Sequence, residues 1–307
     1  MDNALLPRPF MNNRLTSQVL NWAGATLGLL SIFFVWQRFN KYLAGVGWSR
    51  LESWPWAWLG ILAIVYCASN FFLALAWTQV LRGLGSTPKQ AETIRIYGKS
   101  QLAKYIPGNI FHFAGRQGLS MAAGLPAKLI AKSSVVEILL LFLAGSQFVF
   151  LILPLSFPGI SPLACLVILA TLTIFVTSIL RVWLGPHVSS AFVWQALFVA
   201  TSGCIFWGVT QMTGRNEFNM QHVLPIIGAY TIAWLAGLAT PGAPAGIGIR
   251  EAIALVLLGK WMEKDELLTA IVAGRMITIV GDLLFFLISW IEIKKIDMRR
   301  LVSRING

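Results

Sequence analysis

Six long apolar runs constrain this chain more than any other feature. Each is close to the length of about 20 residues at which an α-helix crosses a bilayer. Inside a bilayer the backbone must satisfy its own hydrogen bonds, so we expect each run to be a helix. Tryptophans near several run ends fit the aromatic belts of membrane proteins. The runs are Gln18–Gln37, Trp56–Val80, Ile130–Leu153, Leu163–Val182, Ala191–Gln211 and Leu267–Ile291.

The composition supports an all-α polytopic membrane protein. Of the 307 residues, 57% are hydrophobic and only 12% are charged, whereas soluble domains carry about 25% charged residues. The net charge of +12 would suggest a nucleic-acid partner in a soluble protein. Here the basic residues lie mostly in loops and tails, where the positive-inside rule and anionic lipid explain them better. We therefore expect a membrane partner and no nucleic acid.

A motif occurs twice between these runs. In both copies a Pro-Gly pair precedes an arginine by nine positions, as Pro107 precedes Arg116 and Pro241 precedes Arg250. Proline and glycine break a helix, and the backbone groups freed inside a membrane must find other partners. Interrupted helices in corresponding halves of a chain are the sequence indication of a transporter-like binding site.

The first motif segment (90–125) and the second motif segment (222–258) are predicted to be re-entrant helical hairpins. Each would enter the membrane and return to its own side. The alternative is two full spans per segment. Lys99 and Lys104 argue against it, because they make the first segment a poor lipid-facing helix.

With hairpins, the chain is one membrane domain (1–307) made of two repeats. Repeat 1 (17–153) and repeat 2 (160–291) each contain three spans and a hairpin. Because three is odd, repeat 2 is inverted, and the two hairpins enter from opposite sides. A short N-terminal tail and a basic C-terminal tail complete the domain.

Charge counting orients this arrangement. Sixteen lysines and arginines fall on the side of both termini, seven fall on the other side, and the loop 154–160 has no charge. The positive-inside rule then places both termini in the cytoplasm.

Arg275 is the strongest single candidate for a site residue, because it lies near the middle of the last run. A charge at that depth costs about 2.5–3.5 kcal/mol on insertion scales. Arg275, Thr278 and Asp282 share one helix face. The alternative is a structural Arg275–Asp282 pair that locks this helix to a neighbour.

Arg116 and Arg250 end the two motifs and are predicted to bind substrate with Arg275. Arginine offers a planar donor fork that suits phosphate or carboxylate, and it keeps its charge. His112 shares a helix face with Arg116, and a structural role for it is equally open. Glu137 and Glu251 are interpreted as counterions of arginines, with proton relay as the alternative.

Proline and glycine in the motifs are interpreted as residues that shape the hairpins. They let backbone N–H groups or helix ends face a cavity, which is a common way to hold an anionic group. These residues are Pro107, Gly108, Gly115, Pro241, Gly242, Gly246 and Gly248.

Signatures of enzymes and cofactors are missing. Gly98-Lys99-Ser100 resembles the end of a phosphate-binding loop, but Thr93 occupies the upstream position where such a loop requires glycine. No His/Cys cluster has the spacing of a metal site, and no Gly-x-Ser-x-Gly elbow occurs. We therefore expect no enzyme activity, no cofactor and no metal.

The two motifs resemble those of the lysylphosphatidylglycerol synthase transmembrane-region family of flippase-like membrane proteins. The resemblance covers essentially the whole chain, and it implies recurring roles for Arg116, Glu137, Arg250, Glu251 and Arg275. The chain departs from the family pattern at Ala243-Pro244-Ala245. The family's soluble aminoacyl-transfer domain is not found here, which argues against lysyl-lipid synthesis.

Two functions remain open at this point. The first is a flippase-like transporter of an anionic lipid or a polyprenyl-phosphate-linked sugar, whose phosphate is bound by arginines inside the membrane. The alternative is a non-transporting partner, a lipid-presenting subunit or an integral enzyme of an envelope glycolipid or polysaccharide pathway, with glycosyltransferases as partners. The first predicts that Arg116, Arg250 and Arg275 converge on one cavity.

Overall fold

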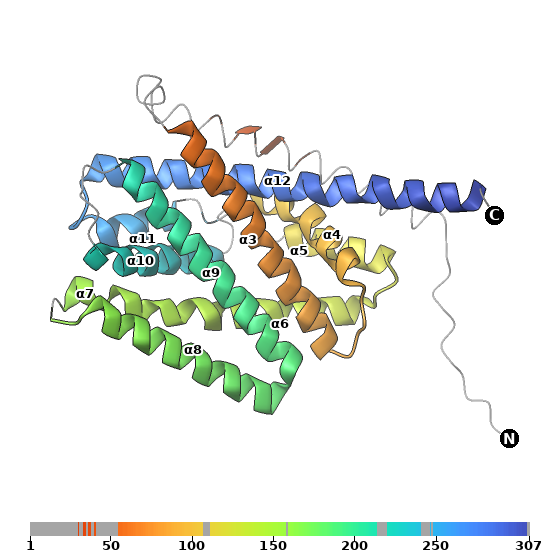
Figure 1. The fold of residues 1–307 in the computed structure, drawn as a ribbon, viewed down its shortest axis with the longest axis horizontal. Coiled ribbons are helices and arrows are strands. Elements are labelled where there is room, and N and C mark those ends of the chain that lie inside the picture. The colour runs from red at the N-terminus through yellow and green to blue at the C-terminus, as the bar shows by residue number, and fades with distance from the viewer. Residues whose placement is uncertain are drawn as a thin grey trace.

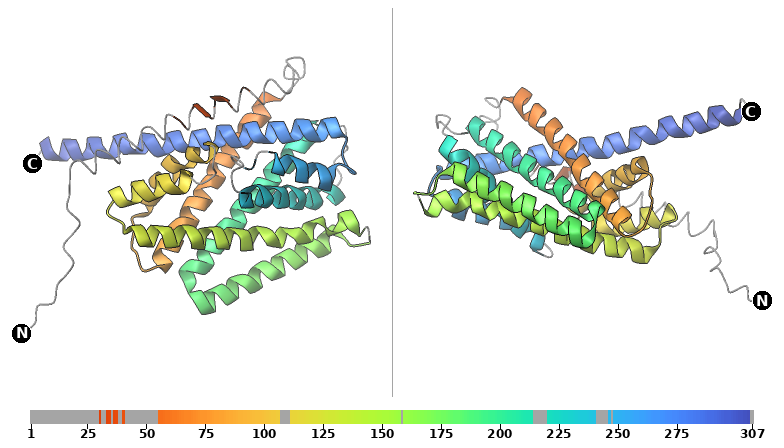
Figure 2. Two further views of the ribbon diagram at one scale, coloured as in Figure 1. Left: turned by 180° about the vertical axis from the view of Figure 1, so that it is seen from behind. Right: turned by 60° about the horizontal axis from the view of Figure 1, so that its bottom comes forward.

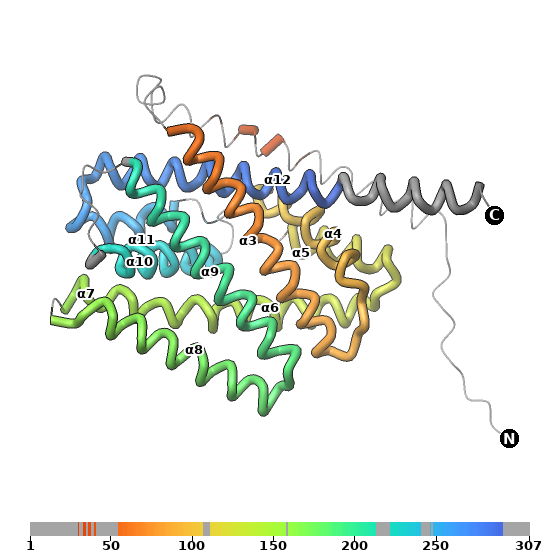
Figure 3. Tube along the Cα trace, viewed as in Figure 1, coloured from red at the N-terminus to blue at the C-terminus, as the bar shows by residue number. Residues whose placement is uncertain are grey.

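The fold was analysed in a computed structural model, which Figure 3 traces in colour. It describes residues 55–106, 111–157, 159–213, 220–240, 246 and 248–305, and six single residues between 30 and 40; the side chains of 213, 220, 221 and 291–305 are not described. The predicted run Gln18–Gln37 therefore lies largely outside the described residues.

Within the described residues every regular element is a helix, as the apolar runs predict. The long helices are α3 (Trp56–Gly83), α6 (Ala127–Ser146), α8 (Pro162–Leu184), α9 (Pro186–Thr213), α10 (Met220–Ala239) and α12 (Lys264–Ile305). The shorter ones are α4 (Gln90–Gln101), η1 (Leu102–Tyr105), α5 (Phe111–Ala122), η2 (Gln147–Ile152), α7 (Leu153–Ser156) and α11 (Ile249–Leu258).

Six helical stretches in the described part are long and apolar enough to cross a membrane, which indicates a multi-pass membrane protein. Five of them coincide with predicted runs. The sixth is α10, which belongs to the second motif segment and was expected to form only part of a hairpin. At a rise of about 1.5 Å per residue, its 20 residues reach about 30 Å, the thickness of the hydrocarbon core.

The other motif helices are too short to span. α4 and α5 have 12 residues each and α11 has 10, so each reaches only about 15–18 Å. The alternative of two full spans per segment therefore does not fit the first segment. Re-entry of either segment into the membrane stays a prediction.

The motif helices lie at opposite ends of the bundle (Figures 1 and 2). α3 and α9 run side by side across its centre, and α12 runs along one side. α4 and α5 pack on each other near the middle of α12, whereas α10 and α11 pack on each other near its start. The two motif segments therefore approach the middle of the molecule from opposite directions.

Close packing of α3 against α12 brings Asp282 of α12 beside α3. A β-carbon built on Gly281 of α12 would lie 2.8 Å from the Ala63 carbonyl oxygen and 3.1 Å from the Cys67 nitrogen of α3. Small residues at such crossings let the backbones of membrane helices approach. The contact places the next residue, Asp282, directly beside α3.

The distribution of side chains is that of a membrane protein. On α8, large apolar side chains face outward, with Leu163 68% and Val182 81% exposed. Charged side chains lie inside, since Asp282 is 0% and Arg116 is 1% exposed. Ionisable residues buried within apolar helices are costly and usually mark functional sites.

Candidate functional site

One cavity receives side chains from both motif segments. Arg116 of α5, Arg250 of α11 and Arg275 of α12 all line it. The convergence expected from the sequence is therefore confirmed as geometry, while ligand binding by these arginines stays a prediction. The cavity measures about 80 Å³. His112, Glu137 and Asp282 line it as well.

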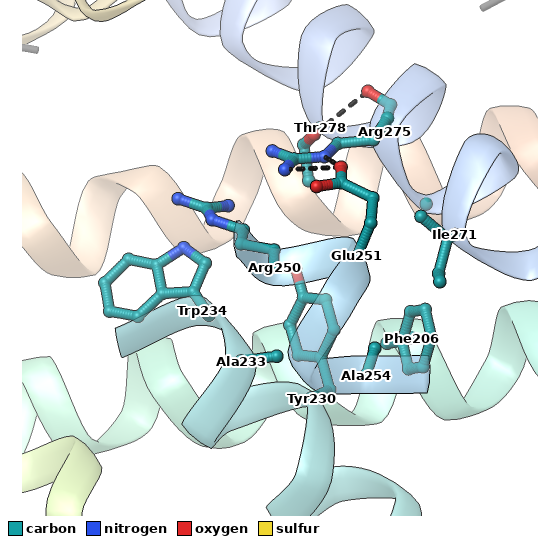
Figure 4. A pocket seen from close by; sticks show the side chains of 11 residues that line it. Phe206, Tyr230, Ala233, Trp234, Arg250, Glu251, Ala254, Ile271, Arg275 and Thr278 are labelled. Carbon is teal, nitrogen blue, oxygen red and sulfur yellow. Dashed lines mark hydrogen bonds and ion pairs between the residues drawn. The ribbon is translucent and has the colours of Figure 1, made fainter. Parts of the chain in front are cut away.

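Glu251, the remaining predicted site residue, lies in an adjoining pocket shown in Figure 4. This pocket measures about 30 Å³ and lies among α9, α10, α11 and α12. Four residues line both pockets, so the two form one region: Trp234, Arg250, Arg275 and Thr278.

Arg116 is sealed in the protein interior. Its guanidinium forms an ion pair with Glu137 of α6, and the Tyr97 hydroxyl donates to the other Glu137 oxygen over 2.9 Å. The guanidinium carbon lies 4.0 Å from the centre of the Tyr97 ring and 5.1 Å from that of Trp77. This cluster ties α5 to α3, α4 and α6, and Glu137 has the geometry of a counterion.

Asp282 holds the first motif segment to α12 and α3. It accepts hydrogen bonds from the Tyr105 hydroxyl over 2.6 Å and from the Asn70 amide over 3.1 Å. The Lys104 ammonium, which also comes from η1, lies 2.7 Å from an Asp282 carboxylate oxygen. The Arg275–Asp282 pair considered from the sequence is wrong, because Lys104 takes the place of Arg275 beside this carboxylate.

Arg275 instead binds Glu251 of the second motif segment. Its Nε and Nη2 donate to the same carboxylate oxygen over 3.0 and 2.8 Å. The other oxygen of Glu251 accepts from the Gly248 backbone N–H over 2.6 Å, which caps α11. Glu251 therefore has the geometry of a counterion for Arg275, and not for its sequence neighbour Arg250.

Arg250 differs from the other cavity cations. In the described part of the chain no hydrogen bond or ion pair reaches it, and its buried Nε has no partner. Its guanidinium carbon lies 5.5 Å from the centre of the Trp234 ring, on which it rests in Figure 4. A cation–π contact of this kind contributes about 0.5–2 kcal/mol and leaves the charge uncompensated.

Two glycines make room for the Arg250 side chain. A β-carbon on Gly237 of α10 would lie 2.5 Å from Arg250 Cγ and 2.7 Å from its Nε. A β-carbon on Gly246 would also lie 2.7 Å from that Nε. Gly246 has φ +70°, a conformation that other residues rarely adopt. The backbone therefore fixes where Arg250 lies.

The charges of this region do not balance. The described residues that line it include four cations and three carboxylates, and each carboxylate has one cation within ion-pair distance. Arg250 is the cation that remains. Arg250 is half-buried, and a charge that is partly removed from water without a partner is unfavourable, so the arrangement favours an anionic ligand. The cations are Lys104, Arg116, Arg250 and Arg275, and the carboxylates are Glu137, Glu251 and Asp282.

His112 adds a neutral polar group to the cavity wall. Burial lowers the pKa of His112, and the positive charges of Arg116 and Lys104 lower it further, so the ring is uncharged near neutral pH. Its Nδ1 is buried and has no hydrogen-bond partner in the described structure. The structure leaves both the structural and the ligand-binding interpretation of His112 open.

Several predicted hairpin-shaping residues, namely Pro107, Gly108, Pro241 and Gly242, lie outside the described residues. Of the described ones, Gly246 and Gly248 have positive φ angles of 70° and 88°. Gly115 lies within α5, where an added β-carbon would be 3.8 Å from Ser100 Cβ. Gly115 therefore sits at the α4–α5 contact and not at a break.

Sequence reasoning missed the polar partners that hold the charged residues. Asn70 and Gln101 contact Asp282, and Tyr97 contacts Glu137. Asn70 was detectable as a strongly polar residue inside an apolar run. Lys104 was noted only as unsuitable for a lipid-facing helix, although a buried lysine needs a nearby carboxylate.

No group of three or more His, Cys, Asp or Glu in the described part of the chain is placed to hold a metal ion. Comparison with protein-family models gives no match for this chain, and comparison with curated proteins gives none.

Proposed function

We propose that this protein binds the anionic headgroup of a lipid, or of a lipid-linked sugar, in the arginine-lined cavity and moves it across the inner membrane of a bacterium. The observation that carries the proposal is Arg250, a half-buried cation beside Arg275 whose buried Nε has no partner in the described structure. Phosphate accepts hydrogen bonds well from arginine forks. Membership of the lysylphosphatidylglycerol synthase transmembrane-region family is part of this proposal, as are cytoplasmic termini.

In this proposal the lipid tail stays in the bilayer while the headgroup passes between the two motif segments. The cavity volume of about 80 Å³ is small, so in this proposal the segments separate to admit the headgroup. Two ion pairs hold them to α12, since Lys104 binds Asp282 from one end and Glu251 binds Arg275 from the other. Alternate opening of these pairs would expose the cavity to one side at a time.

The membrane potential suffices to drive such a movement. Carrying one negative charge outward across an inside-negative membrane yields about 2.3 kcal/mol per 100 mV. The transport needs no ATP, and its rate should depend on an imposed potential.

A lipid-presenting partner of an envelope glycosyltransferase is the second candidate. The observation that favours it is the set of three ion pairs that hold α5, α11 and η1 to α6 and α12. A protein that only holds a lipid for another enzyme would need no second opening. Both candidates require an anion at Arg250.

Fluorescent-lipid translocation in proteoliposomes separates the two candidates. The cargo lipids are phosphatidylglycerol and a polyprenyl-phosphate sugar, measured with and without an imposed potential. We expect transport by the wild type and a loss of about tenfold or more in Arg250→Gln and Arg275→Gln, as charge-assisted hydrogen bonds contribute about 1.5–3 kcal/mol. Arg181→Gln is the matched control, because Arg181 is an exposed arginine at the end of α8.

Transport that Arg250→Gln leaves unchanged would contradict the proposed role of the cavity. No transport of any anionic lipid by well-folded wild type, together with binding, would favour the lipid-presenting candidate.

A further inference from the structure

We propose that the cavity selects a headgroup with one negative charge, as in a phosphodiester, and that Arg250 is the residue that receives it. This inference rests on the proposed function and names its substrate class. It is carried by the pairing of charges in the region, by the free donors around Arg250 and by the position of Glu251.

The first step is that three of the four cations are already neutralised. Arg116 is 1% exposed and lies between aromatic rings beside Glu137. Lys104 is held by Asp282, which also accepts from a tyrosine and an asparagine. Releasing either cation for a ligand would leave a carboxylate buried without its charge partner, which is strongly unfavourable.

The second step is that Arg250 has unused donors beside it. Tyr66 lines the cavity, Tyr230 lines the adjoining pocket, and Arg250 lines both. Among the described residues, no hydrogen bond engages either phenol hydroxyl. A phosphate oxygen on Arg250 would therefore find a free guanidinium and two candidate hydroxyl donors without breaking an existing bond.

The third step is the effect of a second negative charge. A monoanion at Arg250 makes the number of positive and negative charges in the region equal. A dianion would add a charge whose nearest cation, Arg275, is occupied by Glu251 over 2.8 Å. Two charges about 4–6 Å apart in a partly buried site interact by a few kcal/mol, so we expect the monoanion to bind roughly tenfold more tightly or better.

Glu251 then sets the charge selectivity. Replacing it by glutamine removes one carboxylate beside Arg275 and so raises the net charge of the region by one. Glu251→Gln should therefore bind a dianionic headgroup at least as well as a monoanionic one. Arg250→Gln should lose affinity for both, because no cation without a partner remains.

The test is binding of lipids with different charge to the purified full-length protein in detergent. The two probes are phosphatidylglycerol, which has one charge, and phosphatidic acid above the second pKa of its phosphate, which is about 6 for a phosphomonoester. Competition followed by native mass spectrometry, or the shift of the unfolding temperature with lipid concentration, gives the affinity ratio. The matched control is Glu263→Gln, because Glu263 is exposed and lies outside the cavity.

The expected result is a preference for phosphatidylglycerol in the wild type and in Glu263→Gln, and its loss or reversal in Glu251→Gln. Equal or tighter binding of phosphatidic acid by the wild type would overturn the inference. If Glu251→Gln fails to fold, Arg250→Gln decides: loss of both lipids supports the inference, and retention of either one contradicts it.

This measurement needs no translocation, so its failure differs from failure of the proposed transport. A charge preference without transport supports the inference and contradicts the transport. Transport with no charge preference contradicts the inference alone.

Discussion

The two copies of the motif have the same spacing, but their arginines differ in whether an acidic side chain neutralises them. Arg116 and Arg250 each follow a Pro-Gly pair by nine positions. Arg116 has an acidic partner and is sealed, whereas Arg250 has no partner in the described structure. The two copies therefore share the position of an arginine but not its surroundings. One arginine is tied into the structure by an ion pair, and the other is the one that we propose for a ligand.

The difference arises from the span that follows each copy. The helix after the first copy, α6, presents Glu137 to Arg116, whereas the helix after the second, α12, presents Arg275 beside Arg250. α12 also carries the acid for the other segment, since Asp282 pairs with Lys104. One helix thus holds both motif segments, with charges of opposite sign two turns apart.

The largest effect should come from breaking the Arg116–Glu137 ion pair of the first motif copy. Glu137→Gln leaves Arg116 buried without a countercharge, and we expect a loss of about 3–5 kcal/mol in the free energy of unfolding. Unfolding of the purified protein in detergent measures it. The double variant Arg116→Gln/Glu137→Gln is the control and should recover much of the loss, because it removes the unpaired charge. Near-wild-type stability of Glu137→Gln alone would show that the pair is not structural.

A smaller loss of stability is expected when the ion pair between the first motif segment and α12 is broken. Asp282→Asn removes the countercharge of Lys104 but keeps an oxygen that can accept from the Tyr105 hydroxyl, so we expect a loss of about 1.5–3 kcal/mol. A double-mutant cycle with Lys104→Gln measures the coupling between the two side chains. Additive losses would contradict a direct Lys104–Asp282 interaction.

The packing around Arg250 can be tested from the backbone side. Gly237→Ala would place a β-carbon 2.5 Å from Arg250 Cγ, so the arginine must move, at a cost of about 1–3 kcal/mol. We expect weaker binding of phosphatidylglycerol with it. Gly60→Ala on α3 is the control, because no atom lies within 4 Å of its added β-carbon. Equal lipid affinity in both alanine variants would mean that the position of Arg250 does not matter.

The sequence predicted the fold better than it predicted the ion pairs. Five spans follow from run length alone, because only a helix satisfies its backbone inside a bilayer. The length of α10 was underestimated. Its 20 residues were assigned to one hairpin together with the shorter helix α11, which follows the Pro-Gly break. The gathering of the three arginines in one cavity followed from their costly positions in apolar surroundings.

The pairing of those arginines did not follow from the sequence, since it depends on which helix faces which. Arg250 and Glu251 are neighbours in sequence, but consecutive residues on a helix point about 100° apart. Glu251 therefore turns to Arg275 while Arg250 turns to Trp234. For the same reason the shared face of Arg275 and Asp282 did not make them a pair. They lie about 10 Å apart along the helix axis, and each meets a different segment.

The smallest effect on stability should be that of Arg250→Gln, although the same change should abolish lipid binding. Because Arg250 has no ion pair or hydrogen bond in the described structure, its removal leaves no partner unsatisfied. The change also removes a half-buried charge whose partial desolvation is unfavourable. In the described part of the chain, only the cation–π contact with Trp234 is lost. We therefore expect the free energy of unfolding to stay within about 1 kcal/mol of the wild type or to rise. A loss as large as that of Glu137→Gln, measured in the same detergent, would mean that both copies of the motif are structural and that no arginine is reserved for a ligand.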